Sequence, residues 1–362
     1  MNKTSTELKH SPLLETFKSL GVLFSRSGEW SIPYIHSSEG NEYKALRDGV
    51  GIIDRSHWGR LRIAGKDALD LLNRLSTNLL VDLEPDKAIN TVLTTNKGRI
   101  IDLLLVVNLG KDLIVITSPE TPEKVVEWLD FYTFDEDISV ENTVSDSIMF
   151  SVMGPLSNQL IESIGAKELK SFESCLTTLG GQDVILIRSD SFGIPVYDIV
   201  AASKDAQILW DTLKNAGAEP VGENALERLR IENGIPKHGH EIGEDFNPIE
   251  AGFLSSISFD KGCYVGQEVV LRLKTYDKVQ KSLKHITIPS GRATKGSSLE
   301  FEGKEVGIIT SVVNSPDASE ELALGYIRNA YSENGQTLEV KDGSETLLVS
   351  VADIVKNQNQ SF

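Results

Sequence analysis

The chain has 362 residues, of which 40% are hydrophobic and 25% charged. This composition is that of a globular protein and argues against a disordered or fibrous chain. With 36 basic and 53 acidic residues, the formal net charge is −17. Such a surface disfavours non-specific binding to phosphate backbones or anionic membranes, although a local basic pocket for one anionic ligand remains allowed. At roughly 100–200 residues per domain, the length predicts two or three domains.

The two cysteines, Cys175 and Cys263, are too few for a disulfide framework or a four-cysteine zinc site. We therefore expect two thiols in a reducing compartment. The first 24 residues lack the apolar core of a secretory signal. No run approaches the roughly 18–20 apolar residues of a membrane span. These features predict a cytoplasmic protein.

Hydrophobic spacing predicts mixed short elements along the chain. A polar stretch covers 25–40, and Asn96, Lys97 and Gly98 form a hairpin turn. From residue 282 onward, short strands and frequent turns indicate a small barrel or sandwich. This order favours an α+β fold with antiparallel sheets. In chain order, we predict helices at 8–24, 66–78, 122–134, 156–165, 205–217 and 225–234, and strands at 59–65, 88–95, 99–108, 112–118, 148–153, 184–190 and 196–202.

The densest chemical signal lies between residues 230 and 272. Lys261 precedes Cys263 by two residues and would stabilise its thiolate, although a buried, inert structural cysteine is the common alternative. Glu268 and Arg272 share a face in either conformation: one turn apart in a helix, or on the same side of a strand.

The string Lys-Gly-Cys-Tyr-Val-Gly-Gln-Glu at 261–268, followed by Arg272, resembles the signature of YgfZ-type folate-binding proteins. These proteins are relatives of the glycine-cleavage T-protein, an aminomethyltransferase. Segments 229–235 and 247–252 resemble segments that both branches share. Further similarity at 42–56, 65–68 and 95–102 extends the resemblance over most of residues 40–345.

Three departures from the T-protein pattern favour the YgfZ branch. T-proteins carry two adjacent aspartates after the hairpin turn, where this chain has Asp102 followed by Leu103. Their Thr-Gly-Glu-x-Gly segment has a glutamate that grips the pterin, whereas residues 189–193 contain none. They also lack the Lys-Gly-Cys motif.

The resemblance implies three modules in a ring, a cloverleaf around a central folate channel. The first module would comprise residues 1–48 and 143–250, the inserted second module 49–142, and the third 251–362 with the small β-barrel. It implies tetrahydrofolate as cofactor and a role in assembling or repairing iron–sulfur enzymes, including those of tRNA modification. The partners would be iron–sulfur clients or assembly factors, without direct contact to nucleic acid or membrane. The alternatives are a folate-dependent aminomethyltransferase or methyltransferase, and an interaction scaffold that has lost folate.

The resemblance also implies roles for individual residues. Asp102 would contact the folate amine and act as acid or base, and Cys263, tuned by Lys261, would be the reactive thiol. Arg230 would bind the glutamate tail, with Arg228 as a nearby substitute, against the alternative of an exposed helical ion pair involving Glu232. Tyr264 or Trp58 would stack on the pterin or simply fill the core. His238 and His240 match no metal spacing well, and we expect no metal. The predicted folate-binding residues are Asp102, Arg230, Glu232, Tyr264, Gln267, Glu268 and Arg272.

Overall fold

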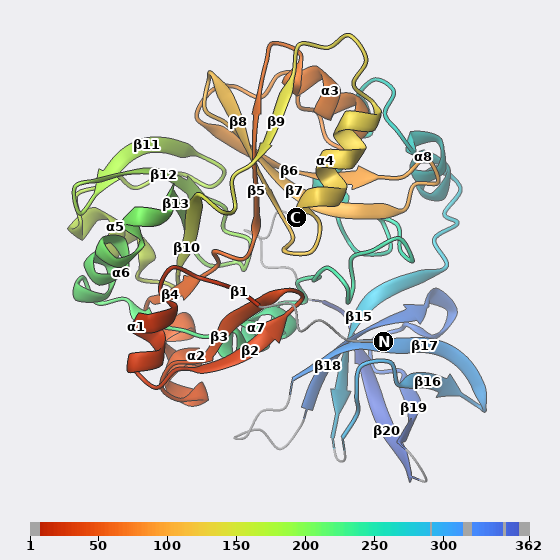
Figure 1. Cartoon of the computed structure of the whole chain (residues 1–362). Coiled ribbons are helices and arrows are strands. Elements are labelled where there is room, and N and C mark those ends of the chain that lie inside the picture. Colours follow the sequence, from red (N-terminus) through yellow and green to blue (C-terminus); the bar gives the residue numbers. More distant parts are fainter. Residues whose placement is uncertain (1–7, 290–291, 314–320, 343–344, 355–362) are drawn as a thin grey trace, which may run out of the picture. The chain divides into compact units, whose positions relative to one another are not determined.

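A computed structural model describes residues 8–289, 292–313, 321–342 and 345–354. The chain forms two compact units, each built from several segments. Figure 1 labels its helices and strands. Unit 1 comprises Met1–Ala68, Leu83–Ala88 and Leu105–Leu226. Unit 2 comprises Leu69–Asp82, Ile89–Leu104 and Glu227–Phe362. The chain therefore enters unit 2 twice before its C-terminal third completes that unit.

Unit 1 contains a six-stranded sheet of order β11-β12-β13-β10-β4-β14 and a three-stranded sheet of order β1-β3-β2. Its largest core includes Phe17 and Trp210, both fully buried. Its elements are β1 (Lys9–His10), α1 (Leu14–Ser19), β2 (Leu23–Ser27), β3 (Trp30–Ile35), α2 (Glu39–Asp48), β4 (Gly51–Asp54), β5 (Gly59–Ala64), β8 (Asp112–Thr117), α4 (Pro122–Phe131), β9 (Ser139–Asn142), β10 (Ser147–Met153), α5 (Ser157–Ser163), β11 (Ser174–Leu179), β12 (Gln182–Arg188), β13 (Val196–Ala202), η1 (Ser203–Asp205), α6 (Ala206–Asn215) and β14 (Glu219–Pro220).

Unit 2 ends in a closed six-stranded barrel of order β15-β18-β17-β16-β19-β20. All pairings in this barrel are antiparallel. Its elements are η2 (Leu254–Ser256), α8 (Gln267–Thr275), β15 (Lys281–Ile288), β16 (Ser298–Phe301), β17 (Lys304–Val313), β18 (Glu321–Arg328), η3 (Asn329–Tyr331), β19 (Thr337–Asp342) and β20 (Glu345–Ala352). Four elements contain residues of both units: α3 (Ala68–Leu75), β6 (Lys87–Thr94), β7 (Ile100–Asn108) and α7 (Glu223–Glu232).

Side-chain spacing explains two elements near the candidate site. In α3, Ala68, Leu71, Leu72 and Leu75 are all buried, which is the spacing of one helix face. Almost every position of β7 is buried, and its branched residues favour a strand covered on both faces. β7 belongs to a five-stranded sheet of order β6-β7-β8-β5-β9.

The predicted α+β class, with antiparallel sheets and a C-terminal barrel, is confirmed. The predicted helix at 8–24 is wrong in extent, because only Leu14–Ser19 is helical between the strands β1 and β2. The polar stretch at 25–40 contains β3, which the sequence pattern did not reveal. Of the two conformations considered for Glu268 and Arg272, the structure has the helix, α8. The three-module division and its central channel stay a prediction.

The helices of the described ranges are too short or too polar for any of them to cross a bilayer.

His36 lies in the core of unit 1, where its ring packs against two aromatic rings. The His36 ring centroid is 5.0 Å from that of Phe17 and 5.8 Å from that of Trp210. Burial, with a smaller contribution from the charge of Lys214, lowers the pKa of His36 from 6.5 to about 4. The folded protein therefore holds this imidazole neutral while the unfolded chain protonates it between these two pH values.

We expect unit 1 to lose stability as the pH falls from 6.5 towards 4, because protons then bind the unfolded chain preferentially. Between pH 7 and pH 5, the unfolding free energy should fall by about 1–2 kcal/mol more in the wild type than in His36→Leu. Urea unfolding at both pH values measures this difference. His10→Leu, at an exposed position, is the control and should behave as the wild type. An equal pH response of wild type and His36→Leu would contradict the assignment.

Candidate functional site

The motif at 261–268 packs directly on the turn of the β6–β7 hairpin, inside unit 2. Gly98 in the turn and Gly266 in the motif both have positive φ, of 65° and 85°. A Cβ at Gly266 would lie 2.5 Å from the Thr95 carbonyl oxygen, and one at Gly98 would lie 3.1 Å from Val269 Cβ. The Thr94 hydroxyl also donates to the Val265 carbonyl at 2.6 Å. This close approach therefore requires glycine at both positions.

Lys261 ties the motif to the end of helix α3. Its ammonium donates to the carbonyl oxygens of Asn73 at 2.7 Å, Ser76 at 2.9 Å and Asn78. The last carbonyls of a helix have no partner within the helix, and a cation there also complements the helix dipole. Lys261 is buried, and burial lowers its pKa to about 8. The geometry gives Lys261 a role in fastening the loop, and its proposed tuning of Cys263 stays a prediction.

Cys263 lies exposed between two buried residues of the motif, Lys261 and Tyr264. The alternative of a buried structural cysteine is therefore wrong. Cys175, on β11 in unit 1, is half-buried, and burial raises the pKa of its thiol. Both cysteines are free thiols.

Asp102 is fully buried on β7, three residues beyond the turn residue Arg99. Its Oδ1 accepts a hydrogen bond from the Leu103 amide at 2.9 Å. The start of β7 is fixed by the Ile100 amide, which donates to the Phe246 carbonyl at 3.0 Å. Strand β7 thus carries a buried carboxylate shortly after the hairpin turn that the 261–268 motif contacts.

Arg230 has all five N–H donors occupied within unit 2. Its Nε and Nη2 donate to the Glu227 carboxylate, and Nη1 donates to Glu241 at 3.0 Å and to the Ile235 carbonyl at 2.7 Å. Nη2 also donates to the Ser311 hydroxyl at 2.7 Å. Burial works to raise the pKa of Glu227, but Arg230 and Lys237 outweigh it and hold this pKa at about 2. A folate carboxylate at Arg230 would therefore have to replace an existing partner.

The other predicted residues divide between α7 and the motif. Glu232 accepts from Arg228 Nε at 3.0 Å, one helical turn away, in a pair that is only partly exposed. Tyr264 is buried, and burial raises its pKa to about 12. Gln267 begins α8 and donates to the carbonyls of residues 261 and 262 at 3.4 Å each. Glu268 and Arg272 lie one turn apart on α8, both exposed.

His240, in the loop after α7, lies within hydrogen-bonding distance of strand β17. His240 Nδ1 lies 3.0 Å from the Ser311 hydroxyl and 3.1 Å from the Thr310 carbonyl. Within the part of the chain that the structure describes, three or more His, Cys, Asp or Glu side chains never group as a metal site requires.

Unit 1 contains a buried polar cluster that sequence reasoning missed. Asp198 on β13 accepts a hydrogen bond from the Ser151 hydroxyl at 2.5 Å, and its Oδ1 lies 3.8 Å from Arg55 Nη1. Burial raises the pKa of Asp198, and the nearby Arg55 charge opposes the shift. The Arg55 guanidinium also covers the ring of Trp58, 3.7 Å from its centroid. The sequence did contain a signal for this cluster, namely an aspartate within the otherwise apolar run 196–202.

Two domains of known families match this chain. The GCVT N-terminal domain matches residues 13–261, and the glycine cleavage T-protein C-terminal barrel domain matches residues 281–355. The chain therefore belongs to the glycine cleavage T-protein family.

Relatives and a solved structure agree over nearly the whole chain. An aminomethyltransferase of Staphylococcus carnosus is 30% identical over 93% of this chain and 95% of the relative. One from Halothermothrix orenii is 28% identical over 92% and 95%. A chloroplastic protein of Arabidopsis thaliana, provisionally named a transferase, is 30% identical over 88% and 74%. The crystal structure of aminomethyltransferase T from Bartonella henselae has a TM-score of 0.87 at 21% identity, covering 97% of this chain and 99% of that one, which shows a shared fold.

Replacing Lys261 should expose its role as a helix cap. Lys261→Met leaves buried carbonyls unpaired and should lower the unfolding free energy by about 1–3 kcal/mol at pH 7. The folded protein releases the Lys261 proton near pH 8, whereas the unfolded chain keeps it until about pH 10.5. The unfolding free energy of the wild type therefore rises as the pH increases from 8 to 10.5. The deficit of Lys261→Met should therefore widen by about 1 kcal/mol at pH 9.5, after allowance for solvent screening. Urea unfolding at both pH values tests this, with exposed Lys97→Met as control. A deficit that shrinks at pH 9.5 would count against the assignment.

The two cysteines should differ in reactivity. Iodoacetamide at pH 7.5 should alkylate Cys263 several-fold faster than Cys175, because Cys263 is exposed while burial raises the pKa of Cys175. Site-resolved mass spectrometry of the native protein measures both rates, and the urea-unfolded protein, where the rates should converge, is the control. A faster Cys175 would show that accessibility in solution does not follow this structure.

Proposed function

We propose that this protein binds tetrahydrofolate and that Asp102 contacts the folate amine. The observation that carries the proposal is the complete burial of the Asp102 carboxylate, directly behind the hairpin turn on which the motif packs. Burying a carboxylate costs desolvation free energy, and buried titratable groups concentrate at functional sites. Membership of the T-protein family supports folate as the ligand class.

Asp102 would act on the ligand through its position on a rigid strand. Its carboxylate can accept an N–H of the folate amine or relay a proton to and from it. We place Tyr264 and Gln267 in the same proposed site, since both belong to the 261–268 motif, which contacts the β6–β7 turn. Arg230 could bind the anionic tail of folate only if that tail displaced one of its present hydrogen-bond partners.

Two functions are compatible with such a site. The first is a YgfZ-type role in the assembly or repair of iron–sulfur enzymes, supported by the exposed Cys263 in the 261–268 motif and by Leu103, which stands where T-proteins carry a second aspartate. The second is folate-dependent aminomethyl or methyl transfer. The names of the relatives favour this second function over the first, whereas the residue pattern favours the first.

Calorimetry with tetrahydrofolate should show saturable binding in the micromolar range, about 8 kcal/mol. Asp102→Asn should weaken binding about tenfold or more, because the charged acceptor is lost, with thermal unfolding confirming that the variant folds. The control is Asp82→Asn, an exposed aspartate in the same unit, which should bind as the wild type. Absence of heat at millimolar tetrahydrofolate would refute the proposal.

A turnover assay and a cellular assay separate the two functions. Transfer of a one-carbon unit from an aminomethyl donor to bound tetrahydrofolate would support the transferase. Binding without turnover, together with loss of iron–sulfur enzyme activity in cells that carry Cys263→Ser, would support the YgfZ-type role. Cys175→Ser is the matched control and should leave that cellular activity intact.

A further inference from the structure

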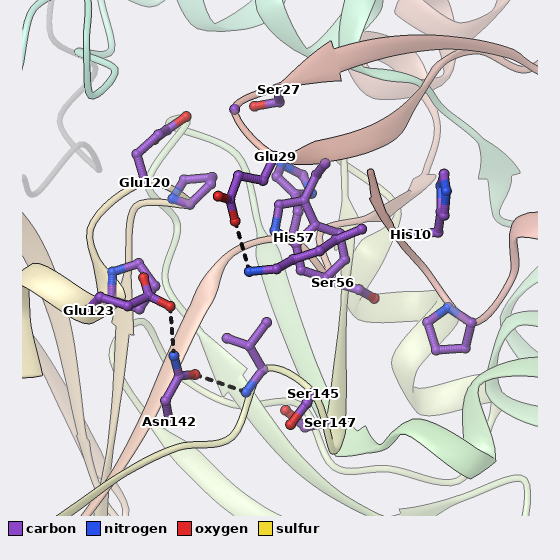
Figure 2. Close-up of a pocket in the computed structure, with 17 residues that line it drawn as sticks. His10, Ser27, Glu29, Ser56, His57, Glu120, Glu123, Asn142, Ser145 and Ser147 are labelled. Carbon is purple, nitrogen blue, oxygen red and sulfur yellow. Dashed lines mark hydrogen bonds and ion pairs between the residues drawn. The ribbon is translucent and has the colours of Figure 1, made fainter. Parts of the chain in front are cut away.

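Unit 1 contains a cavity of about 880 Å³, within the range of small-molecule sites (Figure 2). Its wall comes from five separate segments: β1, the β2–β3 turn, the residues after β4, the start of α4 and the stretch from β9 to β10. None of the residues that we predict to bind folate lines it.

One buried guanidinium binds two segments of the cavity wall. Arg60 is fully buried and donates to the carbonyls of Ser56, Val144 and Ser147, and to the Ser147 hydroxyl at 2.8 Å. These three partners line the cavity, together with the buried imidazole of His57. Arg60 therefore fixes two wall segments, 56–57 and 144–147, before any ligand arrives, which lowers the cost of binding.

The lining side chains carry an excess of negative charge. The lining residues include three glutamates, Glu29, Glu120 and Glu123, and one lysine, Lys9, which pairs with Glu29 at 3.0 Å. Counting histidine as neutral, the formal charge of the lining is −2. In the view of Figure 2, the three carboxylates gather on one side, opposite His10. The start of helix α4 offsets about half a unit charge at most. The Arg60 guanidinium behind the wall adds one positive charge, so the sum stays slightly negative.

Apolar surface accompanies these carboxylates. Trp30 is among the lining residues, together with Pro12, Pro119 and Pro122. Aromatic faces attract organic cations, and tryptophan does so most strongly. Carboxylates beside an aromatic ring and proline rings match a ligand with a positive head and an apolar body.

We propose that this cavity binds a small organic cation, an amine or quaternary ammonium compound, between the Glu120 and Glu123 carboxylates and the Trp30 ring. The proposal is independent of folate binding, because the two residue sets do not overlap. Anions are disfavoured by the same excess of carboxylates.

Choline and its neutral isostere 3,3-dimethylbutan-1-ol, equal in shape but not in charge, are the probes. Saturation-transfer NMR and calorimetry on the full chain should show saturable choline binding at least fivefold tighter than that of the alcohol, weakening as salt rises. Equal binding of the two probes would overturn the proposal. Binding of inorganic phosphate in place of choline would do so as well, as would no choline binding up to about 10 mM.

Charge-removing variants then locate the bound cation. Glu120→Gln combined with Glu123→Gln should weaken choline binding about tenfold. Glu127→Gln removes one carboxylate charge at an exposed position of α4, the helix that carries Glu123, outside the cavity, and should change choline binding less than twofold. Tetrahydrofolate binding, measured on the same samples, should be unchanged in both variants. Loss of choline binding in Glu127→Gln, or its retention in the double variant, would show that the cavity is not the site.

Discussion

The candidate site depends on one ammonium group and the three carbonyl oxygens that it binds. Lys261 closes the end of α3 and, in doing so, brings the motif loop against the β6–β7 hairpin. The side chains that follow Lys261 then diverge, with Cys263 facing solvent and Tyr264 buried. Lys261, the predicted modulator of the Cys263 thiol, is in this structure also the anchor of the loop that carries that thiol.

Local patterns were sufficient to predict most elements near the site. The spacing of Ala68, Leu71, Leu72 and Leu75 identified α3, and the branched apolar run at 99–108 identified β7 around Asp102. Failures arose where local pattern and tertiary packing disagreed. The apolar residues at 8–24 satisfy helical spacing, yet the chain pairs Lys9 and His10 with β3 and shortens the helix to six residues.

Long-range partners account for what the sequence could not provide. Arg230 resembles a free anion-binding residue when read along the chain, because Glu241 and Ser311 lie 11 and 81 positions away. The same limit hid the cavity of unit 1, whose wall draws on five segments that share no motif. Its organiser, Arg60, sits in an ordinary alternating strand, and only the folded structure shows its side chain turned inward to backbone carbonyls.

The saturated guanidinium of Arg230 has a consequence for how unit 2 opens. It joins helix α7, the loop at Glu241 and barrel strand β17 through hydrogen bonds that are all buried or nearly so. None of these segments can separate without stripping partners from a charge that water does not reach. Local fraying of β17 or of the 235–241 loop is therefore penalised, and amide protons in the three segments should exchange with solvent through a shared, larger opening. The barrel would behave as one cooperative body with the helix that precedes it, despite the length of chain between them.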